Sequence, residues 1–127
     1  MFKPEGYGSV SPYVITQHAS RVIDFMVEGL GAERLRRFDG PDGRVVHAEV
    51  RIDDSVVMIG GATAEWTAAP MHIHVYVPDV DAVFRRAVEA GGEVVQEPKQ
   101  QEGDPDRRGG VKDPGGTTWW LSTQQSG

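Results

Sequence analysis

The sequence contains no cysteine in its 127 residues. This absence excludes a disulfide-stabilised fold, a thiolate metal site and a cysteine nucleophile. It also contains no apolar run of the length that crosses a bilayer, so we expect no membrane span. Residues 1–6 lack the apolar segment of a signal peptide, which predicts a cytoplasmic protein.

Basic residues are scarcer than acidic ones. The sequence contains 13 Lys and Arg and 19 Asp and Glu, which gives a net charge of −6. Nucleic-acid binding depends on a basic patch that neutralises phosphates, so we expect no nucleic-acid partner. An acidic surface favours a cationic small ligand, although this balance is also common in soluble proteins that bind none. The 39% apolar and 25% charged content is typical of one globular domain, which we assign to residues 1–127.

The clearest local pattern is residues 71–77, where apolar residues alternate with His72, His74 and Tyr76. This period of two predicts a strand with one buried face and one face that carries polar chemistry. A helical pattern over 80–90 follows. Asp79, just before it, is explained as the helix cap.

The order strand, helix, strand, strand, strand occurs twice. The first copy is predicted at 10–16, 20–28, 32–38, 44–52 and 55–60, with Ser20 as the helix cap and Gly29 or Gly31 past the helix end. The second copy is predicted at 71–77, 80–90, 93–96, a strand that ends at Lys112, and 117–123. A shift of 61 positions moves Val22 onto Val83 and Gly31 onto Gly92.

This repetition predicts an α+β fold of two tandem βαβββ units, which form a curved eight-stranded mixed sheet with the helices on its convex face. The first unit spans about residues 9–61, the linker about 62–70 and the second unit about 71–124. Residues 98–110 are polar and rich in Gly, Pro and charge, so we expect a loop there. Whether this loop is a lid, and whether the units pair within one chain or swap between chains, stays open.

Three segments carry a resemblance to a known family: Ala19–Phe25 followed by Gly29–Glu33, His72–Asp81, and Val111–Leu121. In order, spacing and duplication they resemble the vicinal oxygen chelate superfamily, which contains glyoxalases, extradiol dioxygenases, fosfomycin-resistance enzymes and bleomycin-resistance proteins. The chain looks closest to the glyoxalase-like and bleomycin-resistance-like branch. The resemblance implies a homodimer with sites between paired βαβββ units.

Enzymes of that superfamily usually hold a divalent metal with His or Glu side chains. The resemblance places the four ligand positions at Ser11 or Tyr13, Met58 or Ile59, His72, and Trp120. Only His72 would bind such a metal well, because Met and Trp are poor ligands for a hard or borderline divalent ion. We therefore expect no metal or other cofactor of the usual kind.

A different metal site is the alternative. His72 and His74 share one strand face, and His47 and Glu49 share a face of another strand. If these faces converge, three imidazoles and a carboxylate suit Zn, Ni or Fe. Otherwise they are ordinary polar residues of a sheet, with Glu49 as the best candidate for a general base if burial raises its pKa.

The adjacent Trp119 and Trp120 must point to opposite faces of the last strand, so one packs under a helix and the other lies on the open side. Trp120, at a metal-ligand position of the family, would turn a coordination site into an apolar cavity for a flat molecule. The alternative is that both tryptophans are core or dimer-interface residues. The predicted ligand-binding residues are Tyr13, His47, Glu49, Arg51, His72, His74, Tyr76 and Trp120.

We predict a homodimeric protein that binds a small organic molecule, in the form of sequestering a drug or metabolite, without a catalytic metal. The alternative is a metal-dependent lyase, isomerase or dioxygenase that uses His47, Glu49, His72 and His74. A third interpretation is a protein whose pocket is filled by its own side chains and whose surface is what matters.

Overall fold

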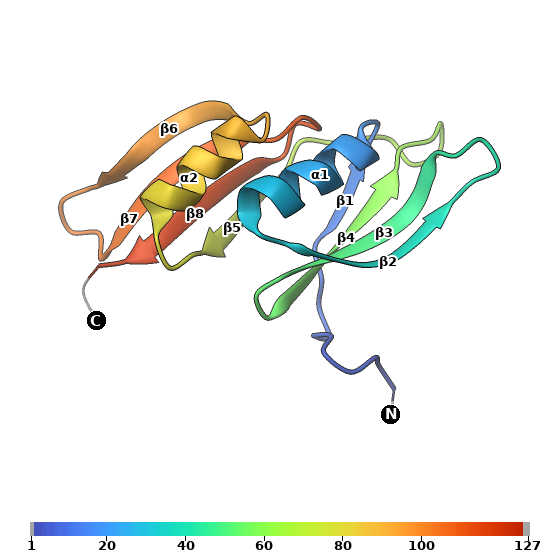
Figure 1. Ribbon diagram of the computed structural model, residues 1–127, viewed down its shortest axis with the longest axis horizontal. Helices are drawn as coiled ribbons and strands as arrows, with labels where there is room; N and C mark the ends of the chain where they lie inside the picture. Colours follow the sequence, from blue (N-terminus) through green and yellow to red (C-terminus); the bar gives the residue numbers. More distant parts are fainter. Residues whose placement is uncertain (1, 126–127) are drawn as a thin grey trace.

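The computed structural model describes residues 2–125, which form two consecutive βαβββ units (Figure 1). The first unit contains β1 (Tyr13–Thr16), α1 (Ala19–Leu30), β2 (Glu33–Asp39), β3 (Val45–Ile52) and β4 (Ser55–Gly61). The second contains β5 (His72–Tyr76), α2 (Val80–Glu89), β6 (Glu93–Gln100), β7 (Asp106–Lys112) and β8 (Thr118–Gln124). The predicted α+β fold of two such units is confirmed.

The eight strands are divided between two four-stranded sheets, rather than forming one continuous sheet. The first sheet has the strand order β1-β4-β3-β2 and the second has the order β5-β8-β7-β6. Each is mixed, because β1 pairs parallel with β4 and β5 with β8, while the other pairs are antiparallel. The sheets lie side by side, with β2 and β6 at the outer edges (Figure 1).

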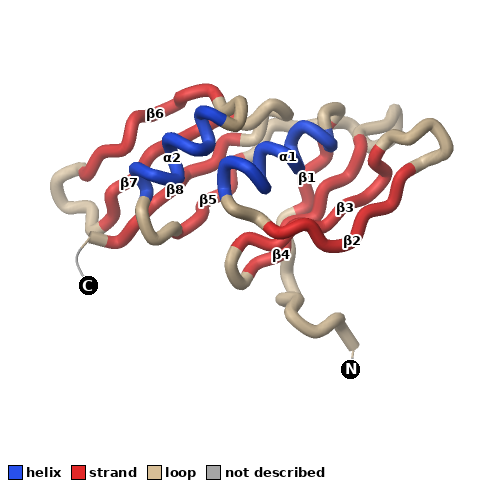
Figure 2. The backbone as a smooth tube through the Cα atoms, in the orientation of Figure 1, coloured by secondary structure: helices blue, strands red, loops and turns tan. Residues whose placement is uncertain are grey.

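Both helices lie on the same side of the sheets and next to each other (Figure 2). Gly29 of α1 allows this approach, since a Cβ there would lie 2.9 Å from the Cα of Ala87 in α2. Beneath the helices the core is closely packed, with Phe25, Trp119 and Leu121 all at 0% exposure. Burial of this apolar area is the main term that stabilises the fold. Neither helix of residues 2–125 is long and apolar enough to cross a membrane.

The helix ends follow the predictions in part. Asp79 caps α2 by accepting a hydrogen bond from the Ala82 N–H, as expected. Gly31 ends α1 in the left-handed region, at φ 72°, which glycine adopts at little cost. The prediction of Ser20 as the α1 cap is wrong, because α1 begins one residue earlier and His18 occupies the cap position without a side-chain hydrogen bond.

The prediction of a loop over 98–110 is also wrong for most of that range. β6 runs on to Gln100 and β7 begins at Asp106, so the two strands form a hairpin with residues 101–105 as its connection. Backbone pairing, such as Lys99 with Arg108, outweighs the polar composition that suggested a loop. Pro98 is tolerated because β6 is an edge strand and the register shifts between Gln96 and Lys99.

Candidate functional site

Each sheet has an open face, which we define as the face opposite the helices. Trp119 is buried under the helices and Trp120 lies half-buried on the open face, as the alternation predicts. The eight predicted ligand-binding residues do lie on open faces, but they separate into two clusters. The first sheet carries Tyr13, His47, Glu49 and Arg51, and the second carries His72, His74, Tyr76 and Trp120.

A row of aromatic rings crosses the open face of the first sheet. Tyr13 lies next to His47 and Trp66, with ring centroids 5.6 and 6.4 Å apart, and Phe38 stacks on His47 at 6.2 Å. The side chains of Phe38 and Trp66 are 56% and 60% exposed. Such rings offer flat apolar area to a ligand. Trp66 lies in the linker after β4, and nothing in the sequence pattern fixes where this linker turns.

A chain of hydrogen bonds runs from Tyr13 through His47 to the buried Glu49. The Tyr13 hydroxyl lies 3.0 Å from Nδ1 of His47, and Nε2 of His47 lies 2.8 Å from Oε2 of Glu49. The Tyr7 hydroxyl donates to the other oxygen of Glu49. Although Glu49 is on the open face, it is only 6% exposed because Tyr7 and its neighbours cover it.

The expected rise in the pKa of Glu49 does not occur. Burial alone raises the pKa of this carboxyl group, but the hydrogen bonds from Tyr7 and His47 and the nearby Arg36 guanidinium together hold it below its ordinary value. Glu49 is therefore ionised at neutral pH and is a poor general base by itself. Its role is to accept hydrogen bonds.

Tyr7 is a site residue that sequence reasoning missed, because it lies before the first predicted strand, in residues 2–9, which we call the lead-in. Its ring lies under the Arg36 guanidinium, 5.5 Å from ring centroid to Cζ. Its hydrogen bond to Glu49 raises the pKa of the Tyr7 hydroxyl. Arg51 also holds the lead-in, because its guanidinium donates to the Gly6 carbonyl at 3.5 Å and to Glu33 at 3.2 Å.

On the second sheet, Trp120 lies flat across Gly110. A Cβ at Gly110 would come within 2.6 Å of the indole, so the ring needs a glycine on the neighbouring strand. The indole and the His72 ring lie side by side, with 12° between their planes and centroids 6.2 Å apart, and the indole Nε1–H donates to Nδ1 of His72 at 3.0 Å. The rings of Trp120 and His72 therefore form one flat surface, which we call the shelf.

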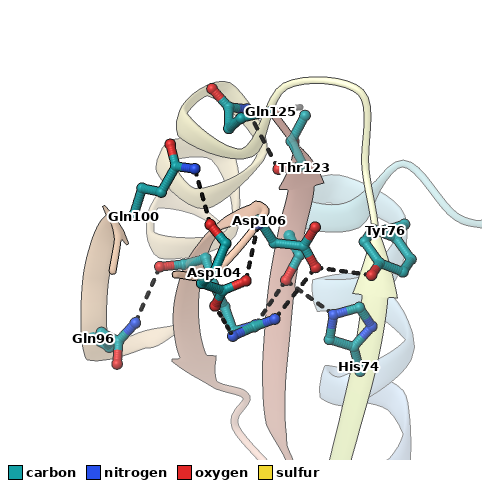
Figure 3. Close-up of polar contacts among 10 residues, drawn as sticks. His74, Tyr76, Gln96, Gln100, Asp104, Asp106, Thr123 and Gln125 are labelled. Carbon is teal, nitrogen blue, oxygen red and sulfur yellow. Dashed lines mark hydrogen bonds and ion pairs between the residues drawn. The ribbon is translucent and has the colours of Figure 1, made fainter. Parts of the chain in front are cut away.

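A polar network lies beside this shelf (Figure 3). Arg108 donates to Ser122 at 3.0 Å, and the Ser122 hydroxyl lies 2.9 Å from Nε2 of His74. Burial, and then the positive charge of Arg108, lower the pKa of His74, so this imidazole is neutral at pH 7. Arg108 and Ser122 were not predicted, because their strands had to pair before they faced His74.

Carboxylates on β7 and its preceding turn complete the network. Arg108 is paired with Asp104 at 2.9 Å and with Asp106 at 3.3 Å, and Tyr76 donates to Asp106 at 2.8 Å (Figure 3). The charge of Arg108 thus faces two carboxylates within the cluster. Tyr76 is fixed with its ring 4.6 Å from that of His74.

The comparison with protein families settles the relationship of this chain. The family model described as the Glyoxalase/Bleomycin resistance protein/Dioxygenase superfamily matches residues 8–121. The chain belongs to this superfamily. An uncharacterized protein of Mycobacterium bovis is 40% identical over 124 residues, which cover 89% of this chain and 81% of that protein.

Two solved structures share the fold of this chain. TioX from Micromonospora sp. ML1 has a TM-score of 0.77 at 24% identity, with 92% of this chain and 99% of that chain covered. TnmS3, an antibiotic binding protein from Streptomyces sp. CB03234, has a TM-score of 0.70 at 22% identity, with 93% and 99% covered. At this identity the likeness concerns the fold.

The donor set does not fit the metal centre that the superfamily resemblance implies. Within residues 2–125, no three His, Asp or Glu side chains form a group that could hold a metal ion. The alternative set is divided, with His47 and Glu49 on the first sheet and His72 and His74 on the second. Trp120, at the last ligand position, offers no metal donor.

A separate groove lies away from both clusters. This groove of about 1430 Å³ runs between the start of α1, the turn between β2 and β3, and residues 61–68 after β4. None of the eight predicted ligand-binding residues lines it. On the two open faces, Tyr13 and Tyr76 are 42% and 62% exposed.

Proposed function

We propose that this member of the superfamily binds a flat organic molecule on the open face of the second sheet, and so sequesters a drug or metabolite without a catalytic metal. The observation that carries the proposal is the position of Trp120, which lies flat on Gly110 with its indole N–H bound to His72. An aromatic residue at a ligand position of the metal-dependent members favours stacking over coordination. The antibiotic binding described for the structural neighbour TnmS3 supports this class of function.

The polar groups around the shelf would orient a bound ligand. His74 is neutral, and its Nε2 faces Ser122, so its Nδ1 is available to a ligand. The net charge of −6 favours a cationic or neutral ligand over an anionic one. A planar aromatic cation fits both the charge and the rings.

We also propose that the ligand site is completed in a homodimer, and that the protein acts in the cytoplasm. The helices cover only the opposite side of each sheet, so both open faces carry exposed aromatic side chains. Such side chains are typical of surfaces that a partner or ligand covers. A second copy could bring one open face over the other and convert a surface into a cavity. Light scattering coupled to size-exclusion chromatography tests the dimer directly.

The proposed function is tested by screening cationic, neutral and anionic aromatic compounds for protection against thermal unfolding, since a ligand raises apparent stability by mass action. Hits are titrated by tryptophan fluorescence. Trp120→Ala should abolish the protection. The control Trp66→Ala removes an exposed indole from the linker after β4, and this variant should keep the protection.

Two results would contradict the proposal. Equal protection of the Trp120→Ala variant would place the ligand elsewhere. Stoichiometric binding of Ni, Zn or ferrous ion to untagged, chelator-stripped protein, lost in His72→Ala, would favour the metal-dependent alternative.

A further inference from the structure

The hydrogen-bonded chain on the first sheet has a defined direction. Glu49 is ionised and can only accept, so Nε2 of His47 carries the proton that it shares with Oε2 of Glu49. In a neutral imidazole the other nitrogen, Nδ1, then accepts, and its neighbour is the Tyr13 hydroxyl at 3.0 Å. Tyr13 therefore directs its proton inward and presents its oxygen lone pairs to the open face.

The order of groups, a hydroxyl, an imidazole and a carboxylate, is that of an activated nucleophile. In such an arrangement the imidazole takes the hydroxyl proton and the carboxylate holds the imidazole and stabilises its charged form. Tyr7 and Arg36 support the carboxylate from its far side, with Nε of Arg36 3.9 Å from Oε1. The chain thus has a reactive end at Tyr13 and an anchored end at Glu49.

Gly60 makes this geometry possible. The Tyr13 side chain starts on β1 and crosses β4 to reach His47 on β3, and it passes directly over Gly60. A Cβ at Gly60 would come within 2.9 Å of Cε1 and 3.2 Å of the hydroxyl oxygen of Tyr13. A second ring, Trp66, stands beside the 42% exposed Tyr13, so an aromatic group of a substrate can stack next to the phenol oxygen.

We propose that Tyr13, His47 and Glu49 form a metal-independent acyl-transfer site for aryl esters. Tyr13 Oη attacks the ester carbonyl and forms a new carbon–oxygen bond, and its proton passes to Nδ1 of His47. The bond to the aryl oxygen breaks, and the leaving phenolate takes the proton from His47. The product is an acyl ester of Tyr13, which water hydrolyses with His47 as the base. An aryl ester suits the site because its leaving group departs readily and its ring can stack on Trp66.

This activity goes beyond the proposed ligand binding and depends only on the first sheet. The test uses the full-length protein and 4-nitrophenyl acetate. We expect a rapid, stoichiometric release of 4-nitrophenolate, together with acetylation of Tyr13 located by peptide mass spectrometry. The two proposals have separate readouts, acetylation of Tyr13 for this reaction and thermal protection by a ligand that is not an ester for the second sheet, so failure of one proposal is distinguishable from failure of the other.

Single variants test the separate roles of Tyr13, His47 and Glu49. Tyr13→Phe should abolish the release phase and the label, and His47→Gln should slow acylation by about a hundredfold or more, as removal of a general base does. The matched control His18→Gln, at an exposed histidine at the start of α1, should react like the parent protein. Glu49→Gln tests a positioning residue, and it should shift the acidic limb of the pH–rate profile as well as lower the rate.

Gly60→Ala keeps all three polar groups but displaces the Tyr13 ring, and it should lose most of the acylation rate while circular dichroism shows a folded protein. The proposal is overturned if acetyl groups appear on lysines and not on Tyr13. It is equally overturned if folded His47→Gln acylates Tyr13 as fast as the parent protein.

Discussion

The hydrogen bond from Tyr7 to Glu49 ties the first residues of the chain to the open face of the first sheet, and Tyr7→Phe removes only its hydroxyl. A hydrogen bond to an ionised group contributes about 1.5–3 kcal/mol to stability when it is well shielded. Tyr7 is half-buried, so water can replace part of the interaction, although Glu49 itself is 6% exposed. We therefore expect the free energy of unfolding to fall by about 1–2 kcal/mol.

The dependence on pH follows from the two pKa shifts. The pKa of Glu49 is below its ordinary value of 4.5 in the folded protein, so its contribution is present above pH 4.5 and is lost as the pH falls through the folded value. The difference between Tyr7→Phe and the parent protein should therefore shrink in acid. The pKa of Tyr7 is raised above 10.0, so its contribution is present below pH 10.0 and is lost as the pH rises through the folded value.

The assay is urea unfolding followed by far-UV circular dichroism, at neutral pH and in acid, for Tyr7→Phe, Glu49→Gln and the double variant. The cycle should give a coupling energy of about 1 kcal/mol at neutral pH. Lys3→Ala is the control, because it removes an exposed hydrogen bond to Ser9 and a contact with the exposed Phe2 ring in the same lead-in, and it should change stability by less than about 0.5 kcal/mol. Additive single effects would refute the reasoning and would mean that the lead-in is not anchored through this pair.

Three further predictions concern packing. In Gly29→Ala, the alanine favours the helix by about 0.5–1 kcal/mol, but its Cβ would clash with the backbone of α2, which cannot move away. We therefore expect the free energy of unfolding in urea to fall by about 1–2 kcal/mol, whereas Glu28→Ala, at an exposed position, should cause no loss. Gly110→Ala should displace the Trp120 indole from its position over β7, which would expose the indole to water and red-shift the tryptophan emission. An unchanged spectrum would contradict the position of the indole over Gly110. Asp113→Ala removes the acceptor of two backbone N–H groups and of the fully buried Trp119 indole, so we expect a loss of about 3 kcal/mol or more by thermal or urea unfolding.

The elements that sequence reasoning recovers are those whose signal is local. Alternation over residues 71–77 places His72, His74 and Tyr76 on one face, and the same rule separates Trp119 from Trp120. The apolar spacing in both helices marks the side that packs on the sheets. These patterns depend only on the repeat of a strand or helix, so they survive without knowledge of which strands pair.

What sequence reasoning missed depends on contacts between distant segments. Tyr7 reaches Glu49 across 42 positions, and Ser122 meets His74 across 48. The hairpin at 98–110 has a loop-like composition and becomes a strand pair only because β7 is already held by β8. The pKa of Glu49 has a similar origin, because burial was predictable in principle but Tyr7 and Arg36, which help to outweigh it, come from the segment before β1 and from β2.

The two open faces use one structural device for different ends. On the first sheet, Tyr13 lies over Gly60, and on the second, Trp120 lies over Gly110. In each case a glycine on the neighbouring strand lets an aromatic ring lie flat against the sheet. The first ring ends in a hydroxyl that is hydrogen-bonded to an imidazole, which suits it to chemistry, whereas the second ends in an indole N–H committed to His72, which suits it to stacking. The rings stand on non-equivalent strands, on β1 over β4 in the first unit and on β8 over β7 in the second, so the two faces reach a similar packing separately and present groups of different reactivity.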